Sequence, residues 1–107
     1  MSIEKPEGNI QDAEAIIFGA ELGSAPEIDL HAMDMNEAER SVDLFLNELF
    51  MSGERVAKII HGRGSGLLRE AVHRSLKRHP LVEYYRDAQA PHSMMGVTYA
   101  VLGSKQK

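Results

Sequence analysis

The chain has 107 residues, which is enough for one domain, since single domains usually run to about 100–150 residues. It contains no cysteine, and this excludes disulfides, thiolate metal sites and a cysteine nucleophile. Its longest apolar stretch, residues 15–20, falls far short of the roughly 20 residues that span a bilayer, and its acidic start lacks the basic region of a signal peptide. We therefore expect a small cytoplasmic protein that has no membrane partner.

The net charge of −4 hides a strong asymmetry along the chain. Residues 1–53 contain twelve acidic and two basic residues, whereas residues 54–86 contain eight basic and three acidic residues. A basic segment in an acidic chain is typical of a phosphate-binding surface or of a solvated helix face. Charge alone favours the solvated face.

The first half of the chain predicts one strand and one long helix. Residues 1–26 are weakly patterned, and only residues 12–18 favour a short helix. Polar and apolar residues alternate over 27–31, which predicts a strand. Asn36, followed three residues later by Glu39, has the pattern of a capping box at the start of a helix that ends at Ser52-Gly53.

The second half predicts three strands and one helix. Residues 55–61 are rich in β-branched residues and form a predicted strand, and the glycine-rich turn 61–66 leads into a helix over 67–78. Strands over 82–86 and 97–102 follow, joined by a loop. The order of elements is therefore β-α-β-α-β-β.

This order predicts a two-layer α/β sandwich with a four-stranded mixed sheet. A helical crossover returns the chain in the same direction, so the first two strands are parallel, whereas the short last link favours an antiparallel pair. We expect an N-terminal extension over 1–26, one domain over 27–103 and a short tail over 104–107. Because a parallel sheet rarely leaves a face bare, we expect Ile16, Ile17 and Phe18 to cover the face opposite the two helices.

Two histidines end the first two predicted strands. Neighbouring parallel strands place His31 and His61 at one edge of the sheet, where function collects in α/β units. Asp29 precedes His31 by two residues, so both side chains face one side of the strand, and a carboxylate orients an imidazole for acid–base work. Each histidine alone is read more simply as an ordinary polar strand end. We interpret His73, His79 and His92 as surface residues.

The glycine-rich turn between the second strand and the second helix predicts an anion site. Gly62, Gly64 and Gly66 allow positive φ and a close backbone approach, and the turn leads to a helix N-terminus, which attracts anions. Arg63 and Arg69 add forked donors that suit phosphate. The simpler alternative is a tight connection that needs glycine for its geometry alone.

Two segments of the chain resemble motifs of the Smr (small MutS-related) domain family. Residues 28–31, followed by Glu37-Ala38, resemble the family's L-D-L-H-G…E-A opening, and residues 61–69 resemble its H-G-x-G-x-G-x-L-R segment. The His-Pro pair after the second helix and Gly96-Val97-Thr98 also fit. Ala32 replaces the glycine that usually follows the first histidine, and alanine would be strained there if the position requires positive φ.

The resemblance implies a small stand-alone bacterial member of this family. It implies a β-α-β-α-β-β fold similar to the C-terminal domain of translation initiation factor 3, and a nucleic-acid partner, either DNA or RNA. Family members are described as DNA-nicking or RNA-cleaving endonucleases, and some only bind. The family's motif positions carry over to Asp29, His31 and His61 with its glycines.

The preferred hypothesis is an endonuclease that hydrolyses phosphodiester bonds in DNA or structured RNA. His31, oriented by Asp29, acts as general base and His61 as general acid, with the two roles interchangeable. The expected phosphate-binding residues are Gly62, Arg63, Gly64, Ser65, Gly66, Arg69, Arg74, Lys77 and Arg78. The sequence offers no compact set of metal ligands, and a divalent cation such as magnesium or manganese is the only cofactor considered.

Two alternative hypotheses assume the same fold without catalytic activity. One is a non-catalytic nucleic-acid-binding module, which Ala32 and the net negative charge favour. The other is a protein-interaction adaptor that uses the acidic first helix of the domain. In each case we expect a monomer.

Overall fold

The computed structural model describes residues 10–104 and contains one four-stranded mixed sheet with three helices. The elements are α1 (Ile10–Leu22), β1 (Glu27–Asp29), α2 (Met35–Met51), β2 (Val56–Ile60), α3 (Leu67–Arg78), β3 (Val82–Asp87) and β4 (Val97–Leu102). The sheet order is β1-β2-β4-β3, with β1 parallel to β2 and the other two pairs antiparallel. The predicted fold class is therefore confirmed. Residues 1–9, and residues 105–107 of the expected tail, lie outside the described residues.

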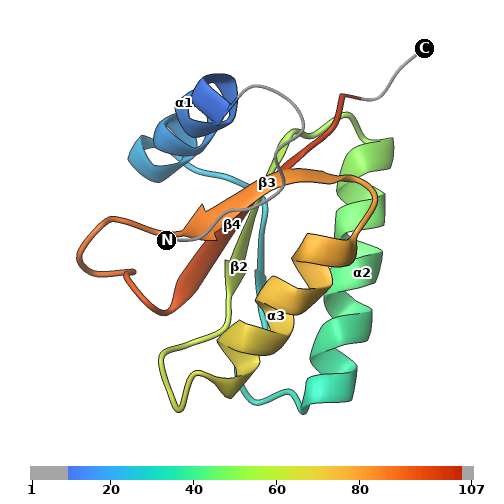
Figure 1. Cartoon of the computed structure of the whole chain (residues 1–107), viewed down its shortest axis with the longest axis vertical. Helices are drawn as coiled ribbons and strands as arrows, with labels where there is room; N and C mark the ends of the chain where they lie inside the picture. The colour runs from blue at the N-terminus through green and yellow to red at the C-terminus, as the bar shows by residue number, and fades with distance from the viewer. Residues whose placement is uncertain (1–9, 105–107) are drawn as a thin grey trace.

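Helices α2 and α3 cover one face of the sheet (Figure 1). Apolar side chains at helical spacing on α2 and α3 meet alternate residues of the strands in one buried cluster, which includes Val42, Leu46, Ile59, Val72, Leu76, Ala100 and Leu102. Burial of this apolar surface is the main stabilising contribution to the domain. His79, at the end of α3, is only 8% exposed, so the expectation of a surface histidine was wrong. Its Nε2 atom lies 3.1 Å from Asp43 Oδ1 on α2.

Helix α2 begins two residues earlier than the sequence suggested. Asp34 is the N-cap: its carboxylate accepts a hydrogen bond from the Glu37 amide at 2.8 Å, and Glu37 Oε1 accepts one from the Asp34 amide at 3.1 Å. The capping box therefore uses Asp34 and Glu37 in place of Asn36 and Glu39.

Helix α1 covers the opposite face of the sheet (Figure 1). Ile17 is fully buried and Ile16 packs against the same cluster, which also contains Tyr84, Tyr99 and Val101 from the strands. Phe18 is 60% exposed, so the expectation that it covers the sheet was wrong, because α1 turns that residue to solvent. The helix is also longer than the predicted residues 12–18, and it adds a partial third layer to the two-layer domain.

A buried arginine fastens α1 to the sheet. Arg86 on β3 is 5% exposed, and its guanidinium lies 2.9 Å from Glu14 and 3.3 Å from Glu21, both on α1. Glu21 also accepts hydrogen bonds from the backbone amides of Gln89 and Ala90. Helix α1 is thereby connected both to the sheet and to the loop that follows β3.

The topology brings several backbone ends to one edge of the molecule. The carboxyl ends of β1 and β2 and the N-termini of α2 and α3 lie together there, at the lower side of Figure 1. Both loops that the sequence singled out, residues 30–34 and 61–66, occur at this edge, which we call the loop edge. Among the described residues, no helix is long and apolar enough to cross a membrane.

Candidate functional site

Asp29 and His31 form a local pair at the end of β1. The His31 backbone amide donates a hydrogen bond to Asp29 Oδ1 at 3.0 Å, and the ring Nδ1 atom lies 3.6 Å from the same oxygen. Both side chains are open to solvent, and that of His31 is 75% exposed. A solvent-exposed imidazole beside a carboxylate can exchange protons with a bound molecule.

The ring of His61 lies on the other face of the sheet. His61 is 5% exposed, and its Nε2 atom lies 2.9 Å from Thr98 Oγ1 on β4. Since β2 lies between β1 and β4, the ring turns away from His31. Asp29 pairs in register with Ile60, whose side chain packs on the α1 side. Strand alternation therefore puts Asp29 and His61 on opposite faces.

The strand ends that carry the two histidines are thus neighbours along the sheet edge, and each ring has its own partner: Asp29 for His31 and Thr98 for His61. The prediction placed the strand ends correctly, because Leu30 N donates to Ile60 O at 2.8 Å. It did not include the direction of the His61 ring. Thr98 on β4 offers a buried hydroxyl on the helix side of the sheet, and the His61 ring bonds to that hydroxyl.

The hydrogen bonds of His61 define which ring nitrogen carries the proton. Nδ1 lies 3.0 Å from the Gly62 carbonyl oxygen, which can only accept, so Nδ1 donates. In the neutral ring Nε2 therefore accepts the Thr98 hydroxyl proton. Thr98 Oγ1 in turn accepts from His73 Nε2, which lies at 2.9 Å and also 3.3 Å from Asp87 Oδ1. A chain of bonds thus runs from Asp87 through His73, Thr98 and His61 to the glycine loop.

Burial keeps both rings of this chain uncharged. Desolvation lowers the pKa of His61 below its usual value, against the opposing effects of the Gly62 carbonyl and Asp87. Desolvation likewise lowers the pKa of His73, although Asp87 opposes the shift. Burial would raise the pKa of Asp87, but the hydrogen bond and charge of Arg69 outweigh it and lower that pKa. At neutral pH the chain therefore has two neutral imidazoles and one carboxylate.

Arg69 is bound to a carboxylate within the protein. Its Nε and one terminal nitrogen donate to the two carboxylate oxygens of Asp87 at 2.9 and 2.5 Å. This forked pair uses the same geometry that Arg69 would offer to a phosphate. Arg69 is therefore half-buried and joins the chain of bonds through Asp87.

The glycine loop retains backbone donors that face no protein acceptor. Gly62, Gly64 and Gly66 have φ values of 79°, 29° and 90°, all in the region that favours glycine. The Gly62 amide donates to Gly96 O at 3.0 Å. Within residues 10–104, the amides of Gly64, Ser65 and Gly66 have no such partner, and α3 begins at Gly66 without a side-chain cap. These amides and the helix N-terminus can bind an anion.

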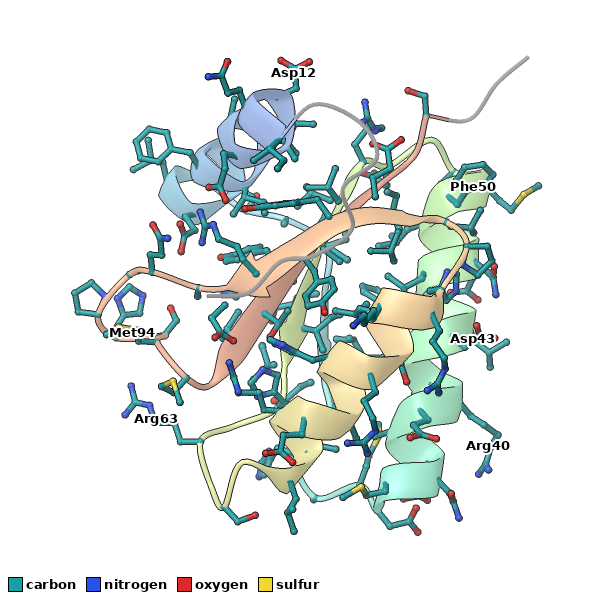
Figure 2. All side chains as sticks on the ribbon, in the orientation of Figure 1. Asp12, Arg40, Asp43, Phe50, Arg63 and Met94 are labelled. Carbon is teal, nitrogen blue, oxygen red and sulfur yellow. The ribbon has the colours of Figure 1, made fainter. Side chains whose placement is uncertain are left out.

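Arg63 joins the glycine loop to the loop over residues 88–96. Its Nε atom donates to Met94 O at 3.1 Å and a terminal nitrogen donates to His92 O at 3.2 Å. Figure 2 shows the Arg63 side chain extending from its loop toward Met94. Its two hydrogen bonds hold the two loops together. Because Arg63 remains exposed, it also adds positive charge to the site.

Three further cations that the sequence singled out lie along α3. Arg74, Lys77 and Arg78 are all exposed, and the last two occupy the final turn of the helix. Positive charge there also suits the helix dipole. Among residues 10–104, no group of three His, Asp or Glu side chains is arranged to hold a metal ion.

Sequence reasoning missed Asp87 and Thr98, and the expectation of a surface His73 was wrong, because its side chain is only 16% exposed and bonds to both of them. Arg69 and His73 stand four residues apart on α3, a spacing that puts them on the same side of a helix, and this was the available signal. Asp87 and Thr98 face each other across β3 and β4, a pairing that the printed sequence does not specify.

The fold and the loop edge are those of a small α/β domain, and comparison with known proteins identifies its family. The family model for the Smr domain matches residues 28–103, and the chain belongs to this family. Endonuclease MutS2 of Clostridium tetani is 41% identical over 76 residues, which is 71% of this chain and 10% of that protein. The chain thus spans about a tenth of the length of the curated relatives it matches.

Two solved structures are also similar. The crystal structure of the Smr domain of Thermus thermophilus MutS2 has a TM-score of 0.72 and 34% identity, covering 74% of this chain and 99% of that one. YdaL, a stand-alone small MutS-related protein from Escherichia coli, has a TM-score of 0.75 and 25% identity, covering 92% of this chain and 80% of that one. A match over 92% of the chain extends beyond residues 28–103 into the N-terminal segment.

Proposed function

We propose that this Smr domain binds nucleic acid at the loop edge and hydrolyses a phosphodiester bond there. The observation that carries the proposal is the exposed His31 imidazole beside Asp29, at the same edge as the unpartnered amides of residues 64–66. The relatives named as endonucleases support the same reaction class. The substrate class is DNA or RNA.

The chemistry divides between the imidazole and the loop. A phosphate held by the amides of residues 64–66 and the N-terminus of α3 would have its developing negative charge stabilised by fixed donors. His31, held by Asp29, takes the proton of the attacking water or ribose hydroxyl. The new oxygen–phosphorus bond replaces the bond to the leaving oxygen, which receives its proton from solvent at this exposed edge.

His61 acts as a positioning residue in this proposal. Its Nδ1 proton is bonded to the Gly62 carbonyl and its Nε2 atom to Thr98, so both nitrogens are in use. The ring thereby fixes the first glycine of the anion-binding loop. This role replaces the general-acid role that its place at the strand end suggested.

The exposed cations on α3 supply the remaining affinity. Arg74, Lys77 and Arg78 would contact phosphates that flank the reacting one, so binding weakens steeply with salt. Each lysine or arginine that is removed is expected to lower the salt slope by about 1.

A cleavage assay on labelled DNA and RNA, with magnesium, manganese or EDTA, tests the proposal. Replacement of the proposed base in His31→Ala should lower the rate by at least about a hundredfold. His61→Ala should lower both binding and rate because the loop loses its anchor. Arg40→Ala, an exposed change on α2, is the control and should leave the rate unchanged. Equal rates in the wild type and His31→Ala would contradict the proposal.

A non-catalytic nucleic-acid-binding domain is the second candidate. The hydrogen bonds of His61 favour it, since both ring nitrogens are bonded inside the protein and so are engaged when the leaving oxygen needs a proton. Salt-dependent binding of the same strands, without cleavage under any of the three conditions, would select this candidate.

A further inference from the structure

A cavity of about 310 Å³ opens beside the glycine loop on the α1 side of the sheet. Ile60 and Val97 contribute apolar side chains, and Gly62 and Gly96 contribute bare backbone. Both apolar side chains belong to the cluster under α1. The volume is at the lower end of the range for ligand pockets, about 300–1,000 Å³, so it suits one small flat group.

The rest of the cavity lining is polar. Lys58, Arg63, His92 and Ser93 supply side chains with donors and acceptors around the apolar residues. Lys58 also pairs with Glu27 across β1 and β2 at 3.7 Å. A ring with apolar faces and hydrogen-bonding edges fits such a lining, and nucleobases have this character.

The cavity adjoins both parts of the proposed reaction site. Gly62 and Arg63 belong to its wall and to the glycine loop, so a phosphate on the loop amides would lie next to the opening. Ile60 pairs in register with Asp29, and neighbouring residues in register point to the same face. Asp29 therefore lies on the same face of the sheet as the cavity, whereas the His61 ring bonds to Thr98 on the helix side.

We infer that this cavity takes one unpaired nucleobase from the nucleotide next to the reacting phosphate. The inference rests on the proposed function and narrows its substrate to single-stranded or locally unpaired nucleic acid. A base in an intact duplex is stacked and paired, so it cannot enter without being extruded. Arg63 sets the cavity wall, because it fastens the 88–96 loop that supplies His92 and Ser93.

The test measures binding of the full chain to a short single strand and to a fully abasic strand of the same length. Fluorescence anisotropy at low salt, with DNA and RNA versions of each strand, gives both affinities. The wild type should bind the strand with bases about tenfold more tightly. Ser93→Leu fills the cavity and should reduce this preference to about twofold, while binding of the abasic strand stays unchanged.

Two further variants make the test decisive. Ile60→Phe fills the same cavity from its apolar side and serves where Ser93→Leu does not fold, as judged by thermal melting. Ser41→Leu is the matched control, because Ser41 lines a cavity of about 320 Å³ on α2 that has no part in the proposal. It should keep the wild-type preference.

The outcomes separate the inference from the proposed function. A wild type that binds both strands equally, or a folded Ser93→Leu and Ile60→Phe that keep the full preference, would overturn the nucleobase pocket alone. A wild type that binds no strand at low salt would overturn the proposed function together with it.

Discussion

The Nε2 atom of His61 lies 2.9 Å from the Oγ1 atom of Thr98. Thr98 is fully buried, and its hydroxyl also bonds to His73, so one small side chain connects β2, β4 and α3. The glycine loop depends on this hydroxyl, because the His61 ring that it orients holds the Gly62 carbonyl.

Thr98→Val should therefore destabilise the domain although the two side chains have similar shapes. The change leaves His61 Nε2 without a partner inside the protein, and an unsatisfied buried group costs about 1–3 kcal/mol. Urea denaturation measures the loss. Thr98→Ser keeps the hydroxyl and loses one methyl group, which costs about 1 kcal/mol. A Thr98→Val domain as stable as the wild type would show that this hydroxyl contributes nothing.

Mild acid should weaken the fold. Burial lowers the pKa of His61 and of His73 below the ordinary 6.5, so above that pH neither the folded nor the unfolded state holds the extra protons. As the pH falls below 6.5, the unfolded state binds protons that the folded state refuses, and the free energy of unfolding falls. The slope reaches up to about 1.4 kcal/mol per pH unit for each ring.

Urea denaturation at a series of pH values from 8 to about 5 measures this dependence. His73→Gln removes one of the two groups and should give a shallower profile. The carboxylates act in the same direction but at lower pH: the pKa values of Asp87 and Glu21 are lowered, so their contribution is lost only as the pH falls through and below their ordinary values of 3.8 and 4.5. A stability that is constant from pH 7 to 5 would contradict the assignment of neutral buried rings.

Ala32→Gly should stabilise the chain. Ala32 has a φ of 73°, in the left-handed region, so the position does require the conformation that the family's glycine suits. A residue with a Cβ atom is strained there by roughly 1–2 kcal/mol, and glycine removes this strain. Part of the gain is offset because glycine makes the unfolded chain more flexible. We expect a net gain of about 1 kcal/mol in urea denaturation.

The matched control for Ala32→Gly is Ala15→Gly, at an exposed position within α1. Glycine in a helix costs about 1 kcal/mol relative to alanine, so this variant should change stability in the opposite direction. If Ala32→Gly and Ala15→Gly both destabilise the chain, the strain at Ala32 is absent in solution.

Arg86→Met should detach α1 from the sheet. The change leaves Glu21, whose side chain is 11% exposed, without its cation, and breaking a buried pair in this way costs about 3–5 kcal/mol. Thermal melting measures the loss. Glu83→Met breaks the pair between Glu83 and Arg55, whose side chains are about 40% exposed, and leaves the Arg55 hydrogen bond to Leu102 O in place, so it should cost less than about 1 kcal/mol. Similar losses in both variants would contradict the fastening role of Arg86.

Removal of residues 1–25 should have a larger effect of the same kind. The truncation deletes Ile17 and both carboxylates that face Arg86, so it exposes the apolar α1 side of the sheet and leaves a buried cation unpaired. The melting temperature should fall. An unchanged melting temperature would show that α1 does not contribute to the stability of the sheet.

Much of the fold could be predicted because local signals agree with the tertiary structure. Helix α3 begins after Gly66 and ends before Pro80 as glycine and proline indicate, and β4 spans the predicted residues. The start of α2 was ambiguous, since both Asp34 with Glu37 and Asn36 with Glu39 have the spacing of a capping box. The extended φ and ψ of Asp34 and its two hydrogen bonds with Glu37 distinguish them in the structure.

The candidate site was predictable only where its contacts are local. Asp29 and His31 stand two residues apart, and their pairing follows from strand geometry. The direction of the His61 ring depends on Thr98, which is 37 residues further along the chain and reaches β2 only through the register of β4. A strand-end position says nothing about such a partner, and for that reason the second imidazole was assigned the wrong neighbours.

The two hydrogen bonds from Arg63 to the 88–96 loop determine which mutations this loop can accept. Both bonds go to main-chain oxygens, those of His92 and Met94, which any amino acid would supply. Side chains at these positions can therefore be exchanged without loosening the loop, whereas an insertion or deletion would shift the oxygens out of reach. The amino acids at these positions can thus vary while the length of the loop stays constant.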